Sequence, residues 1–193
     1  MILGTEKLIG ELIEINRQNI IDVESFLQMP IEELKWKFDS KSWSILECIA
    51  HLNLYSEFYL PELKRAINKN IKPSSYLFYP GYVGDYFVKT IQYKQKLNKM
   101  KTALPMDPIG SILSKEVLRH FIYEQEQVID LLIDAKDVNL NKIKTSISIS
   151  KWIKLKLGDT FRFVVYHNQR HIYQAIKTSE LCRNTAPIGM STF

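Results

Sequence analysis

Four long stretches of the sequence repeat their apolar residues every three to four positions, which is the period of an α-helix with one buried face. In the first stretch, for example, Leu8, Leu12 and Val23 share one face. Helices of this kind bury their apolar faces against one another, so the sequence predicts an all-α four-helix bundle. The predicted helices run from about Thr5 to Gln28, from Ser42 or Ser44 to Asn68, from Ile109 to Ala135, and from Gly158 or Asp159 to Glu180.

The connections between these helices carry most of the prolines and glycines, and two connections have a pattern of their own. The stretch from Lys72 to Gly84 is expected to be a loop, and an extra helical piece follows from about Tyr86 to Met100. The stretch from Thr145 to Leu157 alternates apolar and polar residues, so we expect an extended connection there. The length of 193 residues fits one domain, expected over 1–180, with a C-terminal tail over 181–193.

Composition and charge exclude several classes of protein. No run of about 18 apolar residues exists, so no membrane span is expected. Cys48 and Cys182 are far apart, and the first residues lack the apolar core of a signal peptide, so a cytoplasmic location is expected. The net charge of +5 is modest, and the lysine clusters come without a nucleic-acid-binding motif. We therefore expect no nucleic-acid partner.

Three histidines stand where helices can bring their side chains together. His167 and His171 are four residues apart, so a helix places both imidazoles on one face. His51 lies at the margin of the apolar face of the second predicted helix. Three neutral imidazoles can hold a divalent transition metal and leave a coordination position for a substrate. The spacing fits such a site and fits equally a surface pair beside a hydrogen-bonded His51 at the edge of the core.

Two residues near these histidines are candidates for supporting roles. Glu47, one turn before His51, is the nearest carboxylate in sequence and could accept a proton, or it could be an exposed helix residue. Gln174 follows His171 by about one turn and could orient an imidazole or pack against the core.

The helical pattern also predicts where several other large side chains lie. Arg162 and Arg170 are expected on the exposed side of the last helix. Trp43 and Trp152 are expected to be packing anchors near helix beginnings, and His120 to be an ordinary helix histidine.

Two segments of the chain resemble the two signature regions of the DinB-like superfamily of metalloenzymes. The first is similar to the pattern W-S-x-x-E-x-x-x-H-L, at Trp43, Ser44, Glu47, His51 and Leu52. The second is similar to the pattern H-x-x-R-H-x-x-Q, at His167, Arg170, His171 and Gln174. The order of the segments and their separation also agree, so the resemblance covers the chain from about Leu8 to Ile176.

The resemblance implies that His51, His167 and His171 bind a nickel or zinc ion in an up-down-down-up bundle of four helices. Residues 72–101 are then an insertion, and the protein is expected to form a homodimer. Some members of the superfamily transfer a low-molecular-weight thiol to an electrophile, whereas others are described as metal-dependent hydrolases.

For a small-molecule substrate of this chain we expect thiol transfer ahead of hydrolysis. A hydrolase usually needs a positioned general base, for which only Glu47 offers itself by spacing, whereas a metal makes a thiol nucleophilic by lowering its pKa. Hydrolysis by water activated at the metal and a non-catalytic metal-binding interaction module are the alternatives.

Overall fold

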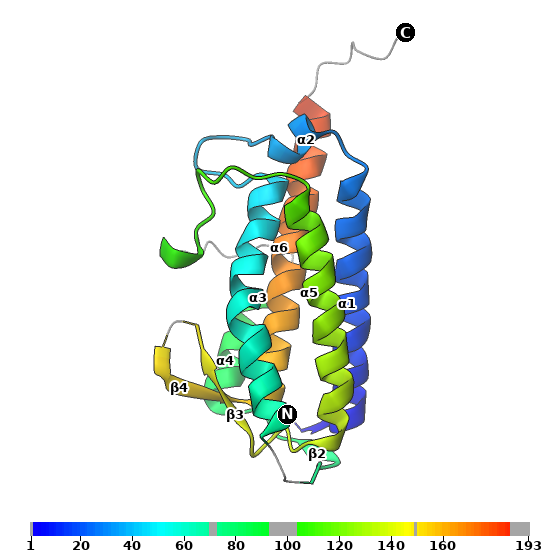
Figure 1. The fold of residues 1–193 in the computed structure, drawn as a ribbon, viewed down its shortest axis with the longest axis vertical. Coiled ribbons are helices and arrows are strands. Elements are labelled where there is room, and N and C mark those ends of the chain that lie inside the picture. The colour runs from blue at the N-terminus through cyan, green and yellow to red at the C-terminus, as the bar shows by residue number, and fades with distance from the viewer. Residues whose placement is uncertain (1, 70–72, 93–103, 149, 186–193) are drawn as a thin grey trace.

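Four long helices lie side by side along the longest axis of the computed structural model (Figure 1). The structure describes residues 2–69, 73–92, 104–148 and 150–185. Helices α1 and α3 each pack against both α5 and α6, and the described chain is mostly helical, as predicted. None of the helices in these ranges is long and apolar enough to cross a membrane. The four long helices are α1 (Thr5–Leu27), α3 (Ile45–Asn68), α5 (Glu116–Asp134) and α6 (Leu157–Thr185).

Short elements connect the long helices. Helix α2 (Ile31–Lys35) precedes α3, and helix α4 (Tyr82–Ile91) packs against α6. Two 3-10 turns flank α5, η1 (Leu104–Met106) before it and η2 (Ala135–Asp137) after it. Two antiparallel strand pairs complete the fold: β1 (Leu3–Gly4) with β2 (Leu77–Phe78), and β3 (Lys144–Ile147) with β4 (Ser150–Lys156).

The structure corrects several predicted element boundaries. The third long helix begins at Glu116 rather than Ile109, and Gly110 adopts a positive φ of 83° in the turn before it. The stretch from Thr145 to Leu157 is mostly a hairpin rather than an unpaired connection, because its alternating residues pair across β3 and β4. Helix α4 begins at Tyr82, inside the predicted loop, and the predicted continuation over 93–100 lies outside the described residues.

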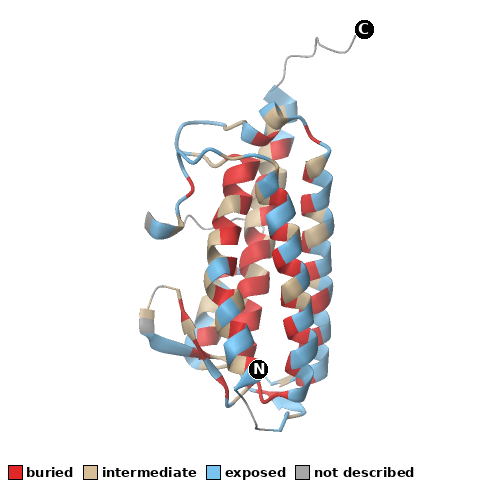
Figure 2. Ribbon diagram, in the orientation of Figure 1, coloured by how far each residue is buried: buried red, intermediate tan, exposed pale blue. Residues whose placement is uncertain are grey.

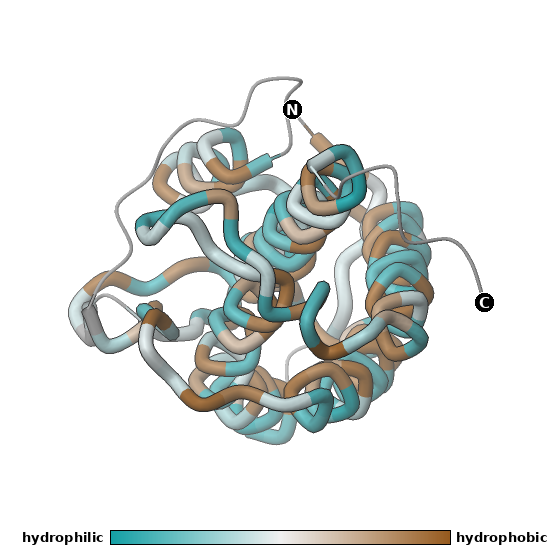
Figure 3. Tube along the Cα trace, turned by 90° about the horizontal axis from the view of Figure 1, so that it is seen from above, coloured by the Kyte–Doolittle hydropathy of each residue, from teal (hydrophilic) through white to brown (hydrophobic). Residues whose placement is uncertain are grey.

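The core consists of two apolar clusters with polar side chains buried between the helices. One cluster includes Leu12, Leu63 and Phe161, and the other includes Ile49 and Phe121. Figure 2 shows that buried residues follow the inward faces of the long helices, and Figure 3 shows apolar residues on those faces from above.

Buried amides link three of the four long helices at the level of one α5 residue, Gln125. The side-chain amide of Asn168 donates to Gln125 Oε1 at 2.7 Å, and Asn16 donates to the Gln125 carbonyl oxygen at 2.9 Å. Hydrogen-bonded polar groups of this kind restrict how the helices can slide along one another. Because Asn168 follows His167, the same contacts fix the height of that histidine in the bundle.

Helix α4 is attached to α6 by a buried charged network. Asp159 accepts a hydrogen bond from the backbone of Gly81 at 2.7 Å and pairs with Arg162 at 3.0 Å. Arg162 also pairs with Asp85 on α4 at 3.0 Å. Arg162 is therefore only 5% exposed, and its predicted position on the solvent side of α6 is wrong, because α4 covers that side.

We predict that Gly84→Ala destabilises the protein. A Cβ atom at Gly84 would lie 2.4 Å from Cγ of Asp159, whose side chain is fully buried, so α4 or the charged network must shift. Overpacking of this kind costs about 1–3 kcal/mol in the free energy of unfolding, measured by urea denaturation. The matched control is Gly10→Ala, where no atom lies within 4 Å of the added Cβ. Equal stability of Gly84→Ala and the wild type would contradict the prediction.

Candidate metal centre

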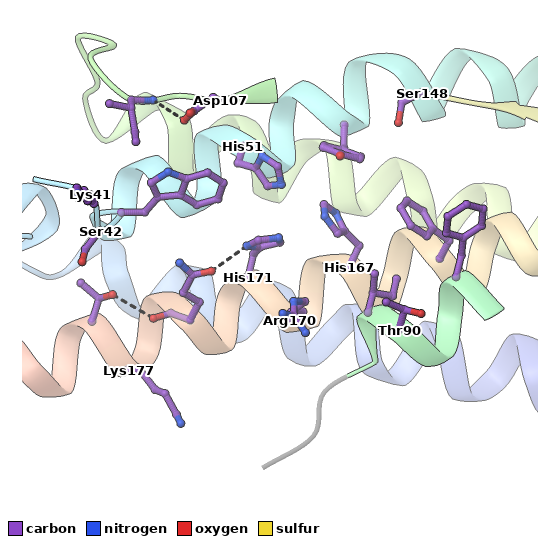
Figure 4. A pocket seen from close by; sticks show the side chains of 18 of the residues that line it. Lys41, Ser42, His51, Thr90, Asp107, Ser148, His167, Arg170, His171 and Lys177 are labelled. Carbon is purple, nitrogen blue, oxygen red and sulfur yellow. Dashed lines mark hydrogen bonds between the residues drawn. The ribbon is translucent and has the colours of Figure 1, made fainter. Parts of the chain in front are cut away.

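The three predicted histidines converge in the structure. His51 comes from α3, and His167 and His171 come from α6 (Figure 4). Their candidate ligand atoms all lie within 4.8 Å of one another. The ring centroids are 4.5 Å apart for His51 and His171 and 5.2 Å apart for His51 and His167. One ion can therefore contact all three imidazoles with only small adjustments.

Burial keeps all three imidazoles neutral. His51 is 2% exposed and His167 is 6% exposed. Loss of solvent is the largest cause of the lowered pKa of each histidine, and the neighbouring imidazoles add to it at His167 and His171. With these effects together, the pKa of His171 falls to about 3. A neutral imidazole keeps the lone pair that a metal requires.

Hydrogen bonds orient two of the three rings. Nδ1 of His51 lies 2.7 Å from the carbonyl oxygen of Met106 in η1, and Nδ1 of His171 lies 3.1 Å from Oε1 of Gln174. Each acceptor is a carbonyl-type oxygen, so each ring donates from Nδ1 and keeps the lone pair on Nε2. The side-chain amide of Gln174 is thus in position to orient the His171 imidazole. Met106 could not be found from sequence, because its backbone oxygen makes the contact.

Glu47 has different partners from those that its spacing suggested. One of its oxygens accepts from the Ser44 backbone at 2.8 Å, and the other accepts from Lys37 at 2.8 Å. The Ser44 hydroxyl accepts from the Glu47 backbone in return, which completes a capping box at the start of α3. The side chain is buried and does not line the cavity described below. Glu47 therefore stabilises the beginning of the helix that carries His51.

Aromatic rings surround the imidazoles. Trp43 lies with its ring centroid 4.7 Å from His51 and 5.6 Å from His171. Tyr55 lies 4.4 Å from His167, and Phe163 stacks on His167 at 5.4 Å. These rings exclude water from the sides of the histidine cluster, which strengthens electrostatic interactions there. Trp43 thus packs near a helix beginning, as predicted.

The histidines face a cavity of about 1010 Å³. Its walls come from the connection between α2 and α3, from α3, α4 and α6, from the connection between η1 and α5, and from the β3–β4 hairpin. A cavity of this size accommodates a small-molecule substrate beside the three imidazoles. The contribution of α4 and the hairpin was not predicted, because it depends on how these connections fold back against α6.

Three other side chains can now be placed. Arg170 is 7% exposed and lines the cavity, so its predicted exposed position is wrong; burial lowers the pKa of its guanidinium. Trp152 is 95% exposed on β4, so its predicted packing role is also wrong. His120 is exposed on α5, with Nε2 3.3 Å from Glu124.

Comparison with known families agrees with the geometry of this site. The family model described as the DinB superfamily matches residues 16–175, a range that contains His51, His167 and His171. The curated proteins and the solved structures that were compared include no match to the chain. Because the family model covers most of its length, the chain belongs to the DinB superfamily.

Proposed function

We propose that this protein binds one divalent transition metal ion through His51, His167 and His171 and uses it to activate a small-molecule substrate. The observation that carries the proposal is the convergence of three neutral imidazoles, with ligand atoms within 4.8 Å of one another, on a cavity of about 1010 Å³. Zinc and nickel are the proposed ions, because both accept imidazole ligands.

The donor set fits an open metal site. Three protein ligands leave a coordination position for a substrate, whereas structural zinc sites use four protein ligands. The hydrogen bonds of His51 to Met106 and of His171 to Gln174 hold the rings with Nε2 free. When bound, a divalent ion lowers the pKa of a thiol or a water molecule that coordinates it.

We place thiol transfer first among the possible reactions. The thiol loses its proton to solvent, and its sulfur forms a bond to an electrophilic carbon as the leaving group departs with the bonding electrons. Such a reaction needs little help from a general base, and the Glu47 carboxylate is held by Ser44 and Lys37. Lys41, Arg170 and Lys177 line the cavity and favour a small anionic thiol.

Hydrolysis is the second candidate, and Asp107 is the observation that favours it. Asp107 lines the cavity, and its charge raises the pKa of His51 against the larger effect of burial. A carboxylate that lines the same cavity as the imidazoles could accept a proton from water. Asp107 also accepts a hydrogen bond from the backbone of Ile109 at 3.1 Å, which holds it in place.

The directions of the long helices support assignment to an up-down-down-up bundle. In Figure 1, α1 and α6 run in one direction along the long axis, and α3 and α5 run in the other. We propose this topology for the fold, with α4 as part of the insertion.

The homodimer implied by the resemblance stays a proposal. Most large apolar side chains of α1 and α5 are buried inside the bundle; the exposed ones are Ile21, Tyr123 and Ile133. The exposed apolar surface available for a dimer interface on α1 and α5 is therefore smaller than the number of apolar residues in these helices suggested. Light scattering at micromolar concentration tests the dimer, and a monomer mass alone would contradict it.

We predict that His51→Ala and His171→Ala remove most of the bound metal. Loss of one of three ligands should weaken metal binding by more than about a hundredfold. Mutation of a residue that only hydrogen-bonds to a ligand already weakens metal affinity about 10- to 100-fold. The measurement is elemental analysis of protein purified without added metal, with thermal unfolding as a check of folding. His120→Ala is the matched control, because this histidine is exposed on α5. Wild-type metal content in both ligand variants would overturn the metal site.

We predict that the metal-loaded protein accelerates the conjugation of a cellular thiol to monochlorobimane. The rate should fall to background in His167→Ala and stay unchanged in His120→Ala. Ester, amide and phosphoester substrates are measured in parallel, together with Asp107→Asn. Hydrolysis that is lost in His167→Ala and in Asp107→Asn, without any thiol conjugation, would reverse the order of the two candidate reactions.

A further inference from the structure

The cavity beside the histidines has two ends that differ in the charge of the described side chains that line them. In Figure 4, Lys41 and Lys177 lie at one end, Thr90 and Ser148 lie at the other, and the three imidazoles lie between them. Among the residues that the structure describes, the charged side chains that line the cavity are Asp39, Lys41, Asp107, Arg170 and Lys177. Asp107 and Arg170 lie beside the imidazoles (Figure 4). Charge is therefore concentrated at one end and at the centre.

The other end begins with a row of aromatic rings that leads away from His167. Phe163 stacks on His167, and Tyr59 follows with its ring centroid 5.6 Å from Phe163. The Tyr59 hydroxyl accepts a hydrogen bond from the Ser148 backbone at 3.3 Å, at the turn of the hairpin. The row therefore connects the histidine cluster to the β3–β4 hairpin.

Helix α4 and the hairpin supply the remaining walls of this end. Phe87 and Ile91 come from α4, and Ile147 and Leu155 come from the two hairpin strands. Leu155 pairs with Thr145 across the hairpin, and Ile147 lies two residues farther along β3, so the side chains of Ile147 and Leu155 share one face. We use the term apolar chamber for the end lined by Tyr59, Phe87, Ile91, Ile147, Leu155 and Phe163.

We infer that the substrate of this site is amphipathic and that its aromatic or branched alkyl group occupies the apolar chamber. Its polar part then points toward Lys41 and Lys177, and its reacting atom lies at the imidazoles between the two ends. Thr90 and Ser148 add hydroxyl groups at the chamber, and no charged side chain of the described residues lines it, so an ionised group there would lose solvent without gaining a charged partner among these residues. The inference rests on the proposed function for the position of the reacting atom.

Two hydroxamates that share a metal-binding group test the chamber. Benzohydroxamate carries a phenyl group where acetohydroxamate carries a methyl group, and calorimetry of the metal-loaded protein gives both dissociation constants. We expect the phenyl group to improve binding about tenfold, because it loses apolar surface to solvent in the chamber. Phe87→Ser should reduce this gain to less than about threefold and leave acetohydroxamate binding unchanged.

The control is Tyr86→Ser on the same helix, because Tyr86 is 67% exposed and does not line the cavity. It should keep the full gain from the phenyl group. A second variant, Thr90→Glu, places a charge at the chamber without removing an apolar side chain, and it should weaken benzohydroxamate alone. This variant keeps the test decisive if Phe87→Ser proves unstable.

A metal-free measurement separates the chamber from the metal site. Fluorescence of 8-anilinonaphthalene-1-sulfonate reports binding of an aromatic anion to the metal-free protein. Its binding should weaken at least threefold in Phe87→Ser and stay unchanged in Tyr86→Ser. If the wild type binds no metal but the dye still binds more weakly to Phe87→Ser and equally well to Tyr86→Ser, the proposed function is overturned and the chamber is supported. Metal and acetohydroxamate binding without any phenyl gain in the wild type would overturn the chamber and leave the metal site standing.

Discussion

The removal of water from three adjacent imidazoles is the constraint on which this structure depends. His51, His167 and His171 lie close enough to share one ion, so protonation of any one of them would place charge beside the other two. Burial lowers all three pKa values and keeps the rings neutral. Neutral imidazoles with free lone pairs, two of them buried and that of His171 partly buried, are costly to leave without partners, and a metal ion satisfies all three at once.

The surrounding fold holds this cluster from both helices that contribute to it. The capping box of Ser44 and Glu47 fixes where α3 begins, and therefore the turn on which His51 lies. On α6, Asn168 bonds to Gln125 next to His167, and Gln174 bonds to His171 itself. Each candidate ligand is thus held by a polar contact, made either by the imidazole itself or by a neighbouring part of its helix. This dependence explains why Glu47 occurs in a metal-site pattern without facing the imidazoles.

Much of the site followed from sequence, because it depends on helical spacing. The i, i+4 separation of His167 and His171 determines that both rings leave α6 on one side, whatever packs there. The partners of Glu47 and the burial of Arg162 could not be predicted in this way. Arg162 is buried because α4 covers α6, and Trp152 is exposed because the hairpin turns that side chain outward. Both outcomes depend on how connecting segments fold back, which helical periodicity does not encode.

X-ray absorption spectroscopy of the zinc-loaded protein tests the central claim most directly, because it counts the imidazoles bound to the ion. The account predicts three imidazole nitrogens at about 2.0–2.1 Å, with a light atom from solvent completing the shell. In His167→Ala the imidazole contribution should fall to two or the zinc should be lost. A wild-type spectrum with fewer than three imidazoles, or an unchanged spectrum in His167→Ala, would contradict the three-histidine site.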